Sequence, residues 1–247
     1  MISPPIHFFL LTFALLTTLI NPHSIHNFCE PTNYYSTPSS TYKTNLNLLF
    51  SSLILNTPKT GFSTAIEGEP PYQVYGLALC RGDIHHDACT SCLNTASESI
   101  VQLCPYPNGG IVWYNNCGVR YSIHNFFSQF PTVKDFFYKC QQSGASKPFE
   151  FKQLVISLME SISEIAAFNA SVKMFVTRVN ARAYGMVQCT RNLSESDCFK
   201  CLNQTFYTLF ERCGATSFGV AVKWSCRVAY SARIFRNSDR IELSPTP

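Results

Sequence analysis

Charged side chains are scarce in this sequence. Lys, Arg, Asp and Glu make up 14% of its 247 residues, and the formal net charge is only +4. The Lys and Arg residues form no basic cluster or stripe, so the sequence gives no support to nucleic-acid binding. Apolar residues make up 46%, which is typical of a globular protein and not of a disordered one.

Long apolar runs are also missing beyond the N-terminus. The run at residues 8–20 has about the length of the hydrophobic segment of a signal peptide and is short for a membrane span. Asn21, Pro22 and Ser24 interrupt it, although its N-terminal flank contains no Lys or Arg. We expect residues 1–24 to be a signal peptide cleaved near Ser24, with no membrane span in the mature chain. The alternative is an uncleaved anchor or a buried strand.

Residue patterns for catalysis are absent as well. No Ser/His/Asp order and no carboxylate pair stands out, so we predict neither an enzyme nor a bound cofactor or metal. The adjacent His85 and His86 point to different sides of a predicted helix start, and a solvated cap explains them better than a metal or acid–base site. Arg81-Gly82-Asp83 resembles an adhesion tripeptide, but we interpret it as the turn into that helix.

Cysteine, by contrast, is abundant and follows a repeat. Five of the twelve cysteines recur at an offset of 109 residues with the same spacing, C-x8-C-x2-C-x11-C-x12-C, and one more precedes each block. The first copy holds Cys29, Cys80, Cys89, Cys92, Cys104 and Cys117, and the second holds Cys140, Cys189, Cys198, Cys201, Cys213 and Cys226. An even number at regular spacing indicates disulfides and an oxidising compartment.

The repeat divides the chain into two domains. We place the first at residues 25–126 and the second at residues 134–238, followed by a short tail at residues 239–247. The junction at residues 129–139 carries Pro131 and is short for a linker. We therefore expect the two domains to touch and to keep a fairly fixed arrangement.

The residue pattern of each copy predicts two helices and an antiparallel sheet. Helical spacing of apolar residues follows the first cysteine of each copy, at Leu46, Leu49, Phe50 and Leu53, and at Phe151, Leu154, Val155, Leu158 and Ile162. A second helix starts just before each C-x2-C, where Ser194 with Asp197 resembles a capping box and His85 is a poorer cap. Strands are expected at residues 72–79, 111–113 and 119–123, and at 181–188, 218–224 and 228–235. The fold class is α+β, with two tandem copies of a small disulfide-rich domain.

Three chemistries could use the C-x2-C. Redox catalysis is disfavoured by a third cysteine eight residues upstream and by the lack of a βαβ context. Zinc usually takes two such pairs, whereas the second pair here is spaced by 12 residues. Structural disulfides are favoured. Because Cβ atoms one helical turn apart are about 5–6 Å from each other, and a bridge needs roughly 3.5–4.5 Å, Cys89 and Cys92 should bond to different partners.

This pattern resembles that of the plant cysteine-rich repeat secretory proteins. The points of similarity are the C-x8-C-x2-C, a Tyr-Gly pair shortly before it, and two copies behind a signal peptide. The domain of that family is called domain of unknown function 26, or the ginkbilobin-homologous domain. The resemblance implies the bridges Cys80–Cys89, Cys92–Cys117 and Cys29–Cys104, and in the second copy Cys189–Cys198, Cys201–Cys226 and Cys140–Cys213.

The resemblance also implies a function outside the cell. We expect a secreted apoplastic protein that acts as a non-enzymatic binding or interaction module in stress or defence, with an extracellular protein or carbohydrate as its partner. The alternative is a directly antifungal or antimicrobial protein of the ginkbilobin type, and a thiol–disulfide enzyme is a third hypothesis. The sequence indicates neither the identity of the partner nor an oligomeric state.

Mannose binding, which the ginkbilobin type shows, is not expected to carry over. The sugar-contact positions correspond to Glu30, Ile111 and Ser122 in the first copy and to Gln141, Val220 and Ser231 in the second. Neither copy keeps the Arg–Glu pair of the ginkbilobin type, so the hydrogen-bonding geometry for a sugar should be lost there.

The second domain alone carries N-glycosylation sequons. They lie at Asn169, Asn192 and Asn203, so we expect the first domain to be the one with surface available for contacts. Trp113 and Trp224 lie two residues out of the repeat register, and we interpret them as packing on strand faces.

Overall fold

The structure of the protein is a computed structural model. It describes residues 24–31, 38–105, 108–127, 129, 136–141, 145, 147–180, 182–214 and 216–232. Apart from Ser24, the predicted signal peptide lies outside these residues, as does the predicted tail. None of the helices in the described part of the chain is long and apolar enough to cross a membrane.

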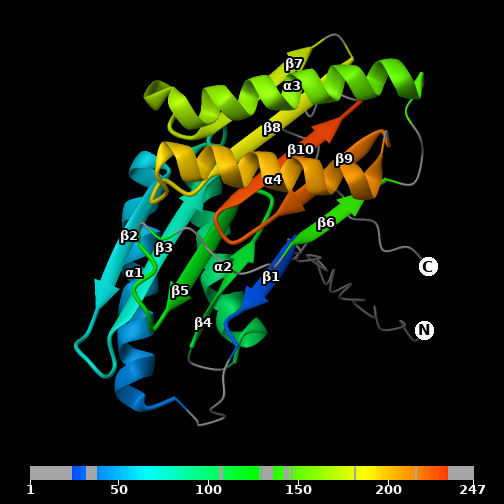
Figure 1. The fold of residues 1–247 in the computed structure, drawn as a ribbon. Coiled ribbons are helices and arrows are strands. Elements are labelled where there is room, and N and C mark those ends of the chain that lie inside the picture. The colour runs from blue at the N-terminus through cyan, green and yellow to red at the C-terminus, as the bar shows by residue number, and fades with distance from the viewer. Residues whose placement is uncertain are drawn as a thin grey trace, which may run out of the picture.

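The first domain is a five-stranded antiparallel sheet with two helices on one face (Figure 1). Its elements are β1 (His26–Cys29), α1 (Ser40–Thr60), β2 (Phe62–Glu67), β3 (Val74–Cys80), α2 (His86–Leu103), β4 (Gly109–Trp113) and β5 (Cys117–Ser122). The strand order is β1-β4-β5-β3-β2. Buried side chains of the two helices, such as Leu49, Leu53 and Leu93, pack on Val119 and its neighbours to form the core.

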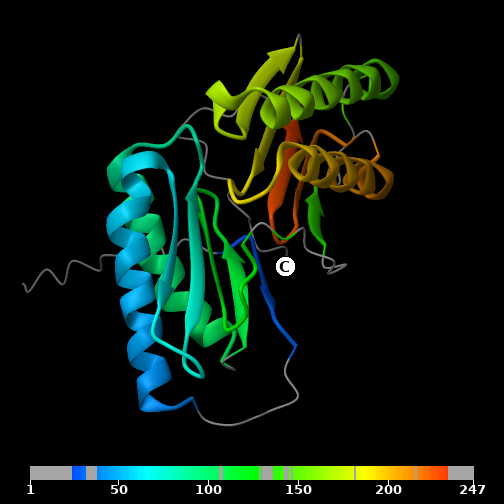
Figure 2. The same cartoon turned by 60° about the vertical axis from the view of Figure 1, so that its left-hand side comes forward.

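The second domain repeats this arrangement. Its elements are β6 (Phe137–Cys140), α3 (Pro148–Phe168), the 3-10 turn η1 (Ala170–Val172), β7 (Phe175–Asn180), β8 (Ala183–Cys189), α4 (Glu195–Cys213), β9 (Phe218–Val222) and β10 (Cys226–Ser231). The strand order β6-β9-β10-β8-β7 matches that of the first domain strand for strand. The predicted α+β class with two tandem copies is confirmed, and Figure 2 shows the two domains side by side.

The predicted helices are present, and their caps differ as expected. Ser194 caps α4 by accepting a hydrogen bond from the backbone N–H of Asp197 at 3.1 Å. His85 occupies the N-cap of α2 and makes no side-chain capping bond.

The sequence predicted three of the five strands in each copy. The four that it missed, β1, β2, β6 and β7, are the edge strands of the two sheets. Edge strands are paired on one side only, and these are short or carry exposed polar residues, so their apolar pattern is weak. The strand expected at 218–224 ends at Val222, because Lys223 to Ser225 form the turn into β10.

The repeated Tyr-Gly pairs have a packing reason. A Cβ atom on Gly76 would lie 2.7 Å from Leu49 Cδ2, and one on Gly185 would lie 2.8 Å from Ile162 Cδ1. Both distances are well below van der Waals contact, so the first helix of each domain packs directly on a glycine of the sheet. A side chain there would clash with these helix side chains and force them to shift in a close-packed core.

Three disulfides in each domain hold its second helix to its sheet. They join Cys29–Cys104, Cys80–Cys89, Cys92–Cys117, Cys140–Cys213, Cys189–Cys198 and Cys201–Cys226, which are the pairs implied by the family resemblance. In the first domain they connect α2 to β1, β3 and β5. All twelve cysteines are bonded, so the protein has no free thiol.

Candidate functional site

Two of the three sugar-contact positions of the first domain come together at the end of its sheet. Glu30 follows β1 and Ser122 ends β5, and the Ser122 hydroxyl donates a 2.8 Å hydrogen bond to Glu30 Oε2. Gly109 allows this approach, because its φ is +146° and a Cβ there would lie 2.9 Å from the same oxygen. Ile111 is different. It is fully buried and packs with Trp113 in the contact between the domains.

An arginine that the sequence comparison missed completes this cluster. Arg120 lies on β5 opposite Ile111, and its Nη2 is 3.7 Å from Glu30 Oε1. Its guanidinium lies 3.8 Å from the ring centre of Phe126 and 4.7 Å from that of Trp224, in the second domain. An Arg–Glu pair is therefore present here, but it comes from different positions than in the ginkbilobin type. The pairing of β4 with β5 would have revealed Arg120, because it places this residue opposite Ile111.

Burial dominates the electrostatics of this cluster. It raises the pKa of Glu30, although the Ser122 hydrogen bond and the Arg120 charge both act to lower it. Burial likewise lowers the pKa of Arg120 to about 10, against the effect of Glu30. Burial and the Glu30 charge raise the pKa of Tyr121 to about 12. The side chains of Arg120 and Glu30 are only 9% and 18% exposed. Ser122 satisfies one oxygen of Glu30, whereas the buried Nε of Arg120 has no hydrogen-bond partner among the described residues.

The second domain has no equivalent cluster among its described residues. Gln141 accepts a 3.3 Å hydrogen bond from Ser217, whereas Val220 and Ser231 are buried. The repeat partner of Arg120 is Ala229, which is also buried. The two copies therefore share a fold and differ in chemistry at the sugar-contact positions.

The two domains touch through a buried polar contact. Arg227 on β10 is 1% exposed and donates a 2.9 Å hydrogen bond to the carbonyl of Asn115 in the first domain. It also donates two hydrogen bonds, of 3.1 and 2.8 Å, to Gln188 Oε1. Gln188 in turn donates a 2.9 Å bond to the Cys80 carbonyl of the first domain. Burial, and then the Arg81 charge, lower the pKa of Arg227 to about 9.

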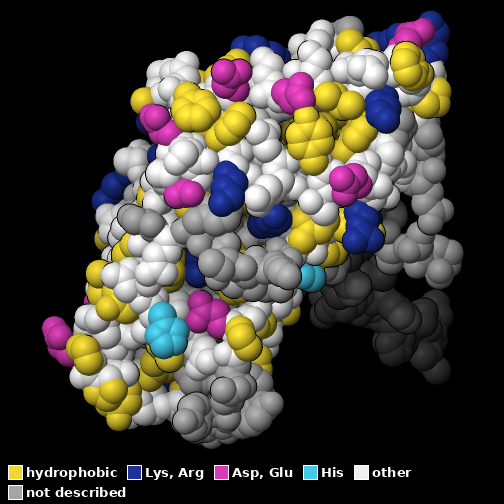
Figure 3. Space-filling view, in the orientation of Figure 1, with side chains coloured by type: hydrophobic (Ala, Val, Ile, Leu, Met, Phe, Trp, Pro, Cys, Tyr) yellow, Lys and Arg dark blue, Asp and Glu magenta, His cyan; other side chains and the backbone are white. Residues whose placement is uncertain are grey.

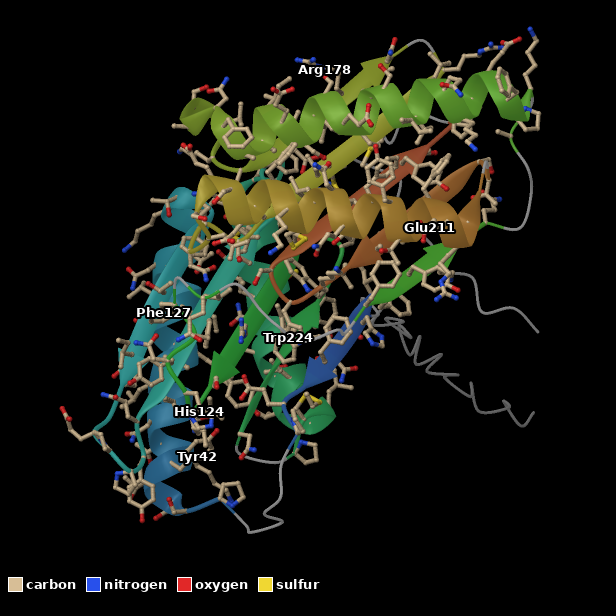
Figure 4. All side chains as sticks on the ribbon, in the orientation of Figure 1. Tyr42, His124, Phe127, Arg178, Glu211 and Trp224 are labelled. Carbon is tan, nitrogen blue, oxygen red and sulfur yellow. A yellow bond between two sulfur atoms is a disulfide. The ribbon has the colours of Figure 1, made fainter. Side chains whose placement is uncertain are left out.

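Both tryptophans belong to this contact. Trp113 is 1% exposed, and its indole N–H donates a 2.8 Å hydrogen bond to the Lys223 carbonyl of the second domain. Trp224 lies where the domains meet (Figure 4) and stacks on Phe28 at 5.9 Å between ring centres. The interpretation as strand-face packing was wrong for Trp224, which lies in the turn between β9 and β10. The register offset reflects this role, because each ring packs against the other domain.

The remaining sequence motif, Arg81-Gly82-Asp83, lies near the domain contact. Arg81 and Asp83 form an ion pair at 2.5 Å, and Gly82 lies against Phe175 of the second domain, although Gly82 and Asp83 remain exposed. The tripeptide is thus a turn whose glycine lies against the other domain and whose Arg81 and Asp83 side chains pair with each other. Within the described ranges no group of three His, Cys, Asp or Glu side chains could hold a metal ion. Acidic and basic side chains intermingle on the face shown in Figure 3.

The repeated fold and its paired cysteines match a known family of proteins. A family model described as "Salt stress response/antifungal" matches residues 28–124 and again residues 139–233. The chain belongs to this family. Both domains are therefore ginkbilobin-homologous domains, and the resemblance noted from the cysteine pattern is confirmed.

Several members of this family are similar over most of the chain. Cysteine-rich repeat secretory protein 38 of Arabidopsis thaliana is 38% identical over 198 residues, which cover 78% of each chain. An antimicrobial ginkbilobin-2-like protein of Castanea crenata is 35% identical over 211 residues, covering 83% of this chain and 86% of the other. The crystal structure of the tandem DUF26 ectodomain of the Arabidopsis receptor-like protein PDLP8 superposes with a TM-score of 0.74 at 24% identity, over 85% of this chain and 98% of that one.

Proposed function

We propose that this protein is a secreted, non-enzymatic binding module that acts outside the plant cell in stress or defence. The observation that carries the proposal is the complete pairing of the twelve cysteines, because six disulfides require an oxidising compartment and leave no thiol for catalysis. Relatives named as secretory proteins support the same location. The buried contact made by Arg227 and the two tryptophans supports a rigid pair of domains that presents one composite surface to a partner.

Secretion is tested with the full chain expressed in plant tissue with a C-terminal tag. We expect it in the extracellular wash fluid, with a mature N-terminus near Ser24. A control that lacks residues 1–24 should stay inside the cell. Retention of the full chain inside the cell, or an uncut N-terminus in a membrane fraction, would contradict the proposal.

Binding is tested with the purified, oxidised protein immobilised on a support and exposed to a plant cell-wall extract. A reduced and alkylated sample of the same protein is the control, because it has the same sequence without the fold. We expect components that bind only to the oxidised form. Treating the extract with protease or with glycosidases then separates a protein partner from a carbohydrate one. Equal retention by both samples would refute a folded binding surface.

A direct antifungal activity is the second candidate function. The similarity to a protein named as antimicrobial favours it. The Glu30–Arg120–Ser122 cluster argues against mannose binding as its basis, because the Arg120 and Glu30 side chains are largely buried and Glu30 is already held by Ser122. Fungal growth with the oxidised protein tests the activity. Binding on a glycan array that is lost in E30Q and S122A would show that this cluster does hold mannose.

The thiol–disulfide enzyme hypothesis is tested by counting thiols. Because every cysteine is paired, we expect no reaction with a thiol reagent in denatured, unreduced protein. A reactive thiol in the native protein would revive this hypothesis.

A further inference from the structure

The three glycosylation sequons lie in different structural environments. All three fit the same sequence rule, so the sequence alone treats them alike. A glycan must leave the folded surface at the asparagine Nδ2, and the hydroxyl two residues later must be reachable by the transferring enzyme. These two requirements can be compared at each sequon.

Asn169 meets both requirements. It ends α3 and starts the 3-10 turn η1, and Asn169, Ala170 and Ser171 are all exposed. Its Oδ1 accepts hydrogen bonds from the Ser171 backbone N–H at 3.1 Å and from the Ser171 hydroxyl at 2.6 Å. Both bonds go to the oxygen, so the Nδ2 that would carry the sugar is not engaged by them. The acceptor amide and the recognised hydroxyl thus lie side by side on an exposed turn.

Asn192 fails the first requirement. Both polar atoms of its side chain are buried, and neither has a hydrogen-bond partner in the part of the chain that is described. The preceding residue, Arg191, is anchored by hydrogen bonds to the carbonyls of Lys173 at 3.1 Å and Thr60 at 2.8 Å. A glycan on Asn192 would have to open a loop that is held at the junction of the two domains.

Asn203 fails the second requirement. It lies on α4, two residues after Cys201, and is only partly exposed. The hydroxyl of its sequon belongs to Thr205, which is fully buried and lies 3.3 Å from Cys226 Sγ. That hydroxyl is closed off once α4 packs and the Cys201–Cys226 bridge forms, so a transfer to Asn203 would have to precede the folding of this domain.

We propose that Asn169 is the N-glycosylation site of this protein and that Asn192 and Asn203 stay unmodified. In this reaction the Asn169 amide nitrogen forms a bond to C1 of an oligosaccharide carried on a polyprenyl diphosphate. The C1–O bond to the diphosphate breaks, the diphosphate leaves with the electron pair, and the amide loses one proton. The proposal rests on the proposed secretion, because this glycan donor is met on the secretory route.

The place of this glycan has a structural consequence. Lys173, just after η1, is linked through Arg191 to Thr60 at the end of α1 in the first domain. In Figures 1 and 2 the C-terminal end of α3 lies on the side of the molecule where α1 ends. The glycan therefore stands beside the domain junction and leaves the far end of the first domain uncovered.

The test uses the full chain secreted from a eukaryotic host, with residues 1–24 replaced by a leader known to function there. The replacement separates this test from the proposed signal peptide. Intact mass is measured before and after treatment with a peptide-N-glycosidase, which converts a glycosylated asparagine to aspartate. We expect the wild type to carry one glycan, with this conversion at residue 169 only.

Four variants make the assignment specific. S171A should have the mass of the bare polypeptide, whereas S171T restores the sequon and should carry the glycan again. N192Q and N203Q are the matched controls and should keep the wild-type glycan. Conversion at residue 192 or 203 in the wild type, or a wild type without glycan beside a glycosylated control protein from the same host, would overturn the proposal. Glycosylation with the foreign leader but no secretion with the native one would refute only the proposed location.

Discussion

Replacing Arg227 with alanine should weaken the contact between the two domains, so that they no longer unfold together. The substitution removes the hydrogen bonds to Gln188 Oε1 and to the Asn115 carbonyl, and it leaves the buried Gln188 Oε1 without its donor. A buried polar group left unpaired costs about 1–3 kcal/mol. Since removing the guanidinium also removes its own desolvation cost, we expect R227A to lower the free energy of unfolding by about 3 kcal/mol. R227M keeps most of the side-chain volume and should lose about 1 kcal/mol less.

The matched control is Arg178, an exposed arginine on the edge strand β7 (Figure 4). R178A removes the same charge from the same domain without touching the contact, and it should change stability by less than about 0.5 kcal/mol.

Tryptophan fluorescence is the natural probe for this series. The chain has two tryptophans, and both Trp113 and Trp224 lie buried in the domain contact. In guanidinium titrations of the oxidised wild type, fluorescence and far-ultraviolet circular dichroism should change together. In R227A the fluorescence change should come at lower denaturant than the loss of secondary structure. Curves for R227A that overlay those of R178A with both probes would refute the assigned role of Arg227.

Four further variants test other parts of the structure. Burial raises the pKa of Glu30 above its ordinary value of 4.5. Between the pKa of the unfolded chain and the higher pKa of the folded protein, the folded state therefore keeps a proton that the unfolded chain has released. The contribution of Glu30 to stability is thus greatest below pH 4.5 and falls as the pH rises through the pKa of the folded state. E30Q should remove this fall in denaturation midpoints measured from about pH 4 to about pH 7, and an unchanged pH profile would contradict the assignment. Replacing both Cys29 and Cys104 with alanine opens a loop with a sequence separation of 75 and should cost about 4 kcal/mol in chemical denaturation. S194A should lower the stability by about 1 kcal/mol in thermal unfolding, because Ser194 makes a capping hydrogen bond. H85S should raise the stability by a similar amount, because His85 makes none and a serine there can. Equal melting temperatures for these two variants would show that the caps do not matter.

The predictable parts of the fold are those encoded by local spacing. The helix at Ser40–Thr60 follows from apolar residues one turn apart, and the α4 cap follows from Ser194 and Asp197. The inner strands are buried on both faces and read as apolar runs, whereas edge strands such as β7 carry polar residues that mask their pattern. An edge strand such as β1 is fixed by its pairing with a strand distant in the sequence, β4, and the spacing of residues within β1 does not show this pairing.

The candidate site shows the same limit. The positions that correspond in sequence to the sugar contacts include Glu30 and Ser122 but not Arg120. Arg120 lies near Glu30 because β5 pairs with β4, and this strand register is not visible in the sequence spacing. Trp224 was likewise assigned to a strand of its own domain, although its ring packs against the other one.

By itself the sequence determined the two-fold repeat, the six cysteines of each domain, the helices and the family, because each of these is a pattern of fixed spacing along the chain. Tertiary structure decided which surfaces the domains share, how Arg120 and Arg227 are buried, and which of three equal sequons is exposed. Arg120 and Arg227 contact residues distant in the sequence, such as Glu30 and Asn115, and the exposure of each sequon depends on how its helix or turn packs. Such contacts form only when strands pair and the two domains pack. The sequence does not show them because burial belongs to the assembled molecule and not to any single stretch of chain.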